Sequence, residues 1–291
     1  MSQVSFEAES ERPNTERSTL ETAGAAPRGK KSVLGVLIDS VDYDAAVDRI
    51  LRAARQRQPL ACCPLSVHTL MTAVLDDEQR YRLNRLDLVV PDGQPVRWAL
   101  NWLHGVGLVE RVYGPELMLR LCAAAGNEAP IYLYGGNQAV VDELEHRLKS
   151  RFPDLRIAGS EAGRYRSLSR TESEELATRI RRSGAALTFV GLGCPRQEVF
   201  AYEWRERLSM PIVVVGAAFD FHAGRVPQAP QALQRAGLEW AFRLAHEPRR
   251  LWRRYLLLNP IFVALLGLEL AGLKRFDAGT ARRPESELRF G

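Results

Sequence analysis

The sequence predicts an α/β protein: a Rossmann-like, mostly parallel sheet with helices on both faces, plus a C-terminal helical appendage. Short runs rich in Val, Ile and Leu alternate with segments of helical spacing from residue 30 to residue 220. Strands that alternate with helices require crossover connections, which produce parallel strands between two helical layers. Beyond residue 220 the chain becomes helical, first basic and aromatic and then apolar. Its 291 residues suffice for one large domain with appendages.

Composition divides the chain into three regions. Residues 1–30 are polar and lack an apolar period, so we expect a disordered N-terminal tail. Residues 31–242 carry the strand and helix pattern of the α/β domain, and residues 243–291 form the basic and apolar appendage. The formal charge of +5 allows an anionic partner without requiring one.

The expected elements follow from local pattern. The strands are short apolar runs, most of which end in Gly, Asp or Asn turns, and they cover residues 30–39, 59–71, 85–93, 129–137, 155–163, 185–193 and 210–220. The helices place apolar residues at helical spacing, and they cover residues 40–58, 72–84, 94–105, 138–153, 169–184 and 194–209.

Two glycine-containing loops follow expected strands. In open parallel sheets, ligands bind beyond the carboxyl ends of the strands. Gly135, Gly136 and Asn137 form one such loop, and Gly191 and Gly193 belong to the other. Backbone N–H groups in such loops can approach a phosphate at a helix N-terminus. A purely structural tight turn would give the first loop the same residues, so both interpretations stay open there.

Large polar groups follow the second loop. Pro195 suits a first helical turn, Arg196 offers a cation for phosphate, and Gln197 and Glu198 can bind hydroxyl groups of a sugar or ribose. A helix-capping motif would explain the glycines and Glu198, but not Arg196 and Gln197 together. A dinucleotide fingerprint is incomplete, because neither loop has its third glycine. A nicotinamide-dependent oxidoreductase would share this sheet and therefore remains only an alternative.

Asp92 stands in a Pro-Asp-Gly turn after an expected buried strand. These residues form turns readily without any chemistry. An aspartate at the rim of a pocket can also act as a general base for a hydroxyl group. Both interpretations of Asp92 stay open at this point.

No metal or cofactor is expected. The Asp42-Tyr43-Asp44 sequence resembles a metal-binding DxD, but it opens a helix, where aspartate caps well. The 5 histidines lack HxxxH or HExxH spacing, and the 4 cysteines lack metal-ligand spacing. Because no apolar signal segment begins the chain, we expect a cytoplasmic protein with reduced thiols.

The appendage opens with a cationic band and continues with an apolar run. Its arginines recur at helical spacing and are Arg249, Arg250, Arg253 and Arg254. The apolar run that follows is interrupted by Asn259, Pro260 and Glu269, which favours a helix in the membrane interface over one that spans the bilayer. Alternatively, the helix packs on its own domain or on a second subunit of a homo-oligomer. A non-catalytic membrane or nucleic-acid binding module would explain the arginines alone.

Six stretches, in this order and spacing, resemble the WecG/TagA/CpsF family of bacterial glycosyltransferases. They are residues 91–93, 111–117, 131–137, 191–198, 215–224 and 237–255. The resemblance implies an inverting, metal-independent hexosyltransferase. It would move a sugar, often N-acetylmannosamine, from a UDP-sugar to a polyprenyl-diphosphate-linked acceptor in cell-surface or exopolysaccharide biosynthesis. Its place would be the inner face of the cell membrane, as a peripheral protein without nucleic-acid partners.

The resemblance also assigns roles to residues. It implies that Asp92 is the catalytic base and that Gln197 lies at the sugar. The remaining positions implied for the donor, besides the two loops, are Ser66, His68, Phe219 and Asp220. Arg243 and the cationic band would bind diphosphate. Two positions depart from the family pattern: His68 replaces an asparagine, and Gln228 replaces an arginine.

Overall fold

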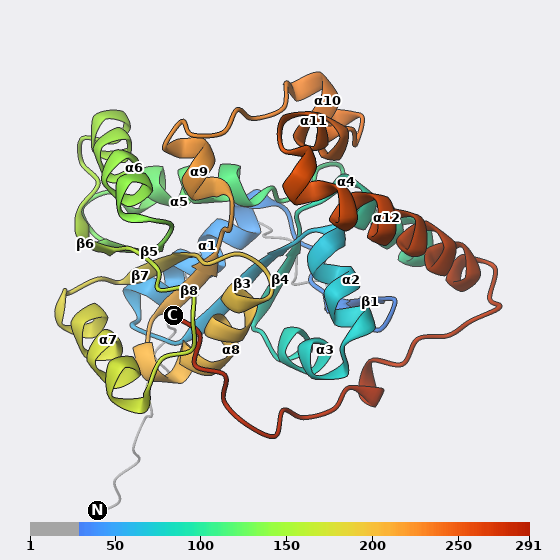
Figure 1. Cartoon of the computed structure of the whole chain (residues 1–291), viewed down its shortest axis with the longest axis horizontal. Helices are drawn as coiled ribbons and strands as arrows, with labels where there is room; N and C mark the ends of the chain where they lie inside the picture. The colour runs from blue at the N-terminus through green and yellow to red at the C-terminus, as the bar shows by residue number, and fades with distance from the viewer. Residues whose placement is uncertain (1–28) are drawn as a thin grey trace, which may run out of the picture.

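The computed structural model describes residues 29–291, so the expected N-terminal tail lies outside the described residues except for its last two. A six-stranded parallel sheet with strand order β4-β3-β8-β7-β5-β6 forms its centre (Figure 1). Its strands are β3 (Leu60–Leu65), β4 (Leu88–Pro91), β5 (Ile131–Gly135), β6 (Ile157–Glu161), β7 (Leu187–Gly191) and β8 (Pro211–Val214). The predicted Rossmann-like α/β fold class is confirmed.

Helices cover both faces of this sheet, and a separate apolar cluster lies under each layer. One layer holds α2 (Val67–Leu75), α3 (Asp77–Asn84), α4 (Gln94–His104), α7 (Arg170–Arg182) and α8 (Arg196–Leu208). The other layer holds α1 (Tyr43–Arg55), α5 (Gly114–Ala125), α6 (Gln138–Arg151) and the short α9 (Ala218–His222). Alternate residues of β3 reach opposite clusters, with Cys62 in one and Cys63 in the other.

The connections obey one handedness. Those through α2–α3, α7 and α8 each move the chain toward the β4 edge, and these helices share one layer. Those through α5 and α6 move it toward the β6 edge, and both helices lie in the other layer. A single crossover hand requires this division. Because all six strands are parallel, they present their carboxyl ends at the same edge of the sheet.

Three sequence-based expectations are corrected. Residues 30–39 form a hairpin of β1 (Lys31–Val33) and β2 (Val36–Ile38) outside the main sheet, because Leu34 and Gly35 turn the chain with φ of 52° and 80°. The strand expected over residues 59–71 ends at Leu65, since Ser66 caps α2 by accepting a hydrogen bond from the Thr69 N–H at 3.3 Å. Helix α5 was not expected at all.

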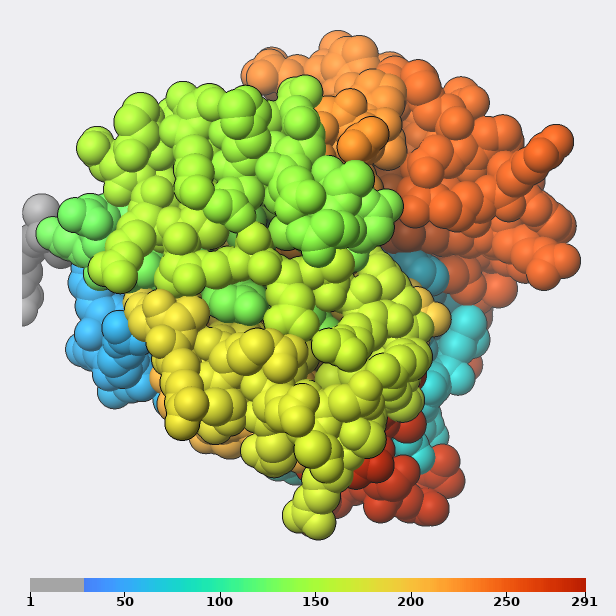
Figure 2. All heavy atoms as spheres, turned by 60° about the vertical axis from the view of Figure 1, so that its left-hand side comes forward, coloured from blue at the N-terminus to red at the C-terminus, as the bar shows by residue number. Residues whose placement is uncertain are grey.

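The C-terminal part consists of α10 (Gln231–Arg235), α11 (Glu239–His246), α12 (Pro248–Leu270) and a 3-10 turn at Ala278–Thr280. Helix α12 docks on the body: it contacts α2, and Leu251, Tyr255, Phe262 and Leu266 are buried. The Glu269 carboxylate accepts a hydrogen bond of 3.0 Å from the Leu34 N–H of the hairpin. In Figure 2 the C-terminal helices (orange) stand beside the green surface that includes α6.

The chain then returns from the far end of α12 to the centre of the molecule (dark red in Figure 1). The N–H groups of Leu288 and Arg289 both donate to the Glu203 carboxylate on α8, at 2.8 Å each. Phe290 forms an antiparallel bridge with Ser167. These contacts fasten the C-terminal end of the chain to α8 and to the segment before α7.

Candidate active site

A pocket of about 250 Å³ lies at the carboxyl ends of four neighbouring strands. Asp92 follows β4, Ser66 follows β3, Gly216 follows β8 and Gly193 follows β7, and all four line the pocket. Helices α11 and α12 close its open side with charged side chains. We call it the central pocket. It occupies the place where ligands bind in open parallel sheets.

Asp92 is held in one orientation at the floor of the central pocket. Its backbone N–H donates to the Leu65 carbonyl at 3.1 Å, and its Oδ1 accepts a hydrogen bond of 2.7 Å from the Gly114 N–H. Within residues 29–291 no group donates a hydrogen bond to Oδ2. That oxygen is therefore free to accept a proton.

Burial raises the pKa of Asp92 to about 6, although Arg111 and the Gly114 N–H oppose the shift. Glu239 pushes the pKa in the same direction as burial. Arg111 donates to Glu239 at 2.8 Å, and the Tyr113 hydroxyl donates to the same carboxylate at 3.0 Å. This network joins α11 to the loop before α5. A carboxylate with a pKa near 6 is a better base than an ordinary aspartate, yet it is mostly ionised at pH 7.

Three arginines from the C-terminal helices line the central pocket: Arg243 from α11, and Arg250 and Arg254 from α12. Arg250 is paired with Glu247. Arg243 and Arg254 form no ion pair within the described chain, and the Nε atom of each is buried without a hydrogen-bond partner. Burial lowers the pKa of Arg254, and the neighbouring cations add to the effect. An anion such as a diphosphate would satisfy these groups.

The glycines of the two loops have different surroundings. A Cβ at Gly135 would meet the Gly191 backbone at 2.5 Å, and one at Gly191 would meet the Phe219 ring at 2.8 Å. These positions therefore allow β5, β7 and α9 to approach one another. Gly191 and Gly193 line the central pocket, whereas Gly135 and the next two residues do not.

The two residues after Gly135 form hydrogen bonds that fix the local backbone. The Gly136 N–H donates to the Gly191 carbonyl at 3.1 Å, and Asn137 caps α6 by accepting from the Val140 N–H at 3.0 Å. The structural interpretation of this loop thus has direct support. Its proposed contact with a donor stays a prediction.

The residues after Gly193 lie in different environments: some line the central pocket, and others are buried or exposed. Gln197 lines the central pocket, while Glu198 is completely buried beneath it. Pro195 and Arg196 are exposed, and the Arg196 guanidinium lies 5.9 Å from the centre of the Tyr165 ring. Asp220 also lines the central pocket, whereas the Phe219 ring is buried.

A second hollow of about 460 Å³ adjoins the central pocket between α2 and α12, and Arg250 and Arg254 line both. We call it the adjoining groove. His68 and Arg253 line it together with leucines of α12, while Arg249 is exposed and lines neither hollow. Burial, with Arg254 and Arg243, lowers the pKa of His68 to about 3. The imidazole is therefore neutral at pH 7.

Sequence reasoning missed several lining residues: Tyr113, Gly216 and Glu239, with Arg111 behind them. Arg111 and Glu239 lie 128 positions apart, so no local pattern could pair them. Both fall within stretches that carry the family resemblance, and this is the signal that could have identified them.

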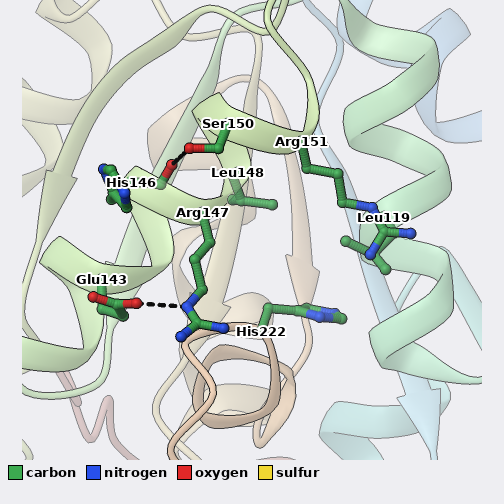
Figure 3. Close-up of a pocket in the computed structure, with 8 residues that line it drawn as sticks. All are labelled: Leu119, Glu143, His146, Arg147, Leu148, Ser150, Arg151 and His222. Carbon is green, nitrogen blue, oxygen red and sulfur yellow. Dashed lines mark hydrogen bonds and ion pairs between the residues drawn. The ribbon is translucent and has the colours of Figure 1, made fainter.

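A separate depression of about 490 Å³ lies between α5, α6 and α9 (Figure 3). We call it the α6 depression. It is lined by Leu119, Glu143, His146, Arg147, Leu148, Ser150, Arg151 and His222. The Arg147 Nε donates to Glu143 at 2.5 Å, and the His222 Nε2 is hydrogen-bonded to the Pro115 carbonyl at 2.9 Å. Its two arginines are exposed to solvent.

Within residues 29–291, no three His, Cys, Asp or Glu side chains gather in a way that could hold a metal ion. In the DxD-like segment, the Asp42 side chain caps α1 by accepting a hydrogen bond of 2.9 Å from the Ala45 N–H. Asp44 is almost fully exposed beside Arg120. The helix-capping interpretation of this segment has direct support.

The family model of the glycosyl transferase WecG/TagA/CpsF family matches residues 31–275, which is most of the chain. The chain belongs to this family. A glycosyltransferase of the family acts on a sugar-nucleotide donor and an acceptor, which favours glycosyl transfer over the oxidoreductase and over the non-catalytic module. Residues 276–291, which include the segment that returns to α8, lie beyond the match.

Proposed function

We propose that the protein transfers N-acetylmannosamine or a related hexose from a UDP-sugar to a polyprenyl-diphosphate-linked acceptor, with inversion and without a metal ion. The observation that carries this proposal is a single pocket that combines a carboxylate of raised pKa, Asp92, with two unpaired arginines. A base and a cationic site for diphosphate are the two components that such a transfer needs.

Asp92 acts as the general base. Its Oδ2 takes the proton of the acceptor hydroxyl while that oxygen attacks the anomeric carbon from the face opposite UDP. The new C–O bond forms as the bond from the anomeric carbon to the UDP oxygen breaks, and the electron pair leaves with UDP. The Gly114 N–H fixes Oδ1 at 2.7 Å and so aims Oδ2. One in-line displacement inverts the anomeric configuration.

Arginine side chains stabilise the departing diphosphate. Charge develops on its bridging oxygen during bond cleavage, and preorganised cations in a partly buried site stabilise that charge better than water does. Arg243 and Arg254 have unpartnered, buried Nε–H donors for this purpose. Arg250 and Arg254, which also line the adjoining groove, are placed to bind the diphosphate of the acceptor.

Polar groups around the floor bind the sugar. Ser66, Gln197 and Asp220 line the central pocket and supply donors and acceptors for hydroxyl groups. Gly191 and Gly193 leave room for the sugar nucleotide to approach the backbone. The buried position of Glu198 does not support a direct contact with the donor.

We expect helix α12 to hold the site at the membrane surface. Its outward face carries exposed apolar side chains, including Leu256, Leu257, Ile261 and Val263. The helix is long and apolar enough to cross a bilayer by length and composition. Its buried Phe262 and its contact from Glu269 to the hairpin instead favour a helix that lies in the interface. Arginines near anionic lipid contribute about 1 kcal/mol each.

Transfer tests the proposal directly. Purified protein is incubated with UDP-N-acetylmannosamine and a short-chain polyprenyl diphosphate that carries one sugar, with and without EDTA. We expect a lipid-linked disaccharide of inverted configuration at equal rates in both reactions. Absence of transfer and of donor hydrolysis across a panel of UDP-sugars would refute the proposed donor class, and loss of activity in EDTA alone would refute the metal-free mechanism.

Vesicle binding tests the membrane role. Val263→Glu places a charge on the exposed face of α12, and Ala139→Glu places one on exposed α6 as a matched control. We expect the first variant to bind phosphatidylglycerol vesicles more weakly than the wild type and the second to bind equally. Equal binding by all three proteins would contradict the interfacial role of α12.

A further inference from the structure

We infer that Glu198 is a positioning residue, which fixes the side-chain amide of Gln197 toward the sugar without touching a substrate itself. The inference rests on the proposed function, because it assumes that Gln197 contacts the donor sugar. It replaces the direct donor contact that the sequence suggests for Glu198 with a role that acts through its neighbour.

The orientation of the Gln197 amide is fixed by its neighbours. The Gly193 N–H lies 3.1 Å from Gln197 Oε1, and a backbone N–H can only donate. The atom that faces it must therefore be the amide oxygen. The amide nitrogen Nε2 consequently points to Glu198 Oε1 at 3.0 Å, where a carboxyl oxygen accepts its hydrogen bond.

These two hydrogen bonds leave one N–H and one oxygen lone pair of Gln197 for a ligand. Gln197 is 7% exposed and lines the central pocket, so its remaining donor and acceptor are available to a molecule bound there. A Cβ at Gly216 would lie 3.4 Å from the amide oxygen, which shows how closely the backbone after β8 confines the amide. One donor and one acceptor at fixed positions suit a sugar hydroxyl.

The surroundings of Glu198 suit a residue that positions a neighbour and not one that contacts a substrate. Its side chain is 0% exposed, and its Oε2 has no hydrogen-bond partner within residues 29–291. Burial raises its pKa, and the hydrogen bond from Gln197 partly offsets the rise. Whether the carboxyl group is protonated on Oε2 or ionised, Oε1 accepts from the amide. A buried polar group of this kind is retained at a cost in stability.

Two substitutions separate the hydrogen bond from the volume of the side chain. Glu198→Gln keeps an acceptor for the Gln197 amide, whereas Glu198→Leu keeps a similar volume without one. With UDP-N-acetylmannosamine as donor, we expect Glu198→Leu to lower kcat/KM by about tenfold, the value of one hydrogen bond, and Glu198→Gln to stay within about threefold of the wild type.

A double-mutant cycle distinguishes positioning from general support of the fold. In a Gln197→Ala background, Glu198→Leu has no amide left to position, so we expect no further loss of kcat/KM. Additive losses, or a Glu198→Gln variant as impaired as Glu198→Leu, would overturn the inference.

A structural measurement keeps the inference independent of turnover. In protein labelled with ¹⁵N-glutamine, the Gln197 side-chain amide should exchange its hydrogens slowly in the wild type and in Glu198→Gln, and rapidly in Glu198→Leu. Equal exchange in all three proteins would overturn the inference even if transfer proceeds. The expected exchange pattern without transfer from any UDP-sugar would instead leave the positioning intact and refute the proposed function.

Discussion

The central pocket and the α6 depression are both rich in arginine, yet only the central pocket combines its arginines with a candidate catalytic base. The α6 depression is the larger, about 490 Å³ against about 250 Å³. Its Arg147 is paired with Glu143 and its cations are exposed. The central pocket instead holds two arginines with buried, unpartnered Nε atoms beside a carboxylate of raised pKa.

Buried polar groups without partners, and not the volume of a hollow, distinguish the central pocket from the α6 depression. Exposed cations keep their hydration, and pairing with a neighbouring carboxylate neutralises much of their charge at little net gain. Buried cations without a partner carry a desolvation cost that a bound anion repays. The fold adds a reason of its own, because only the central pocket lies at the carboxyl ends of the strands.

The largest effect should follow from removing the base. Asp92→Asn keeps an acceptor for the Gly114 N–H but cannot take a proton at pH 7. We expect transfer to fall by about 10²- to 10⁴-fold, which is the usual contribution of a general base. Asp44→Asn, in the exposed DxD-like segment, is the matched control and should transfer at the wild-type rate. Near-normal turnover by Asp92→Asn would exclude Asp92 as the base.

Replacing one arginine in each hollow should have a smaller effect on transfer, and only in the central pocket. Arg254→Gln removes an unpaired cation from the central pocket, and we expect kcat/KM to fall by about 10- to 100-fold because a charge-assisted contact to diphosphate is lost. Arg151→Gln makes the same change in the α6 depression and should remain within about twofold. Similar losses in both variants would remove the distinction between the two hollows.

The pH dependence of transfer reports the raised pKa of Asp92. Because the base must be ionised, kcat/KM should rise with pH below about 6 and level off above it. At the acid end the slope should approach tenfold per pH unit. A profile that is already level at pH 5 would mean that the reactive base has an ordinary carboxyl pKa.

The last prediction concerns the free energy of unfolding of Asp92→Asn and how it depends on pH. Since burial raises the pKa of Asp92, the folded state disfavours its ionised form, and this group's contribution to stability is lost as pH rises from about 4 to about 6. Asp92→Asn carries no charge at any of these pH values. We expect it to be more stable than the wild type by on the order of 2 kcal/mol at pH 8 and equally stable near pH 3, as measured by urea unfolding. A less stable variant at pH 8 would contradict the raised pKa.

Much of the fold could be predicted because parallel strands and their helices have local signatures. The apolar runs over residues 185–193 and 210–220 were expected as strands, and strands formed at Leu187–Gly191 and Pro211–Val214, although α9 begins inside the second run. The hairpin at Leu34 and Gly35 was missed because one apolar run covers both short strands. The boundary at Ser66 was missed because a helix cap stands inside a continuous apolar segment.

Part of the site was predicted because its residues follow strands: Asp92, Gly193 and Gln197 all line the central pocket. Its cations were predicted from the basic C-terminal segment and the family resemblance, and those that line the pocket are Arg243, Arg250 and Arg254. Long-range neighbours such as Glu239 required the folded chain. So did the burial of Glu198 directly beside the pocket-lining Gln197, since adjacent residues at the start of a helix point in different directions.

A crystal structure of the protein with UDP tests the central claim most directly. We expect the diphosphate in the central pocket within hydrogen-bonding distance of Arg243 or Arg254, on the side of the pocket that leaves Asp92 Oδ2 open to an acceptor. UDP bound in the α6 depression beside Arg147, or a central pocket left empty at saturating UDP, would contradict the account.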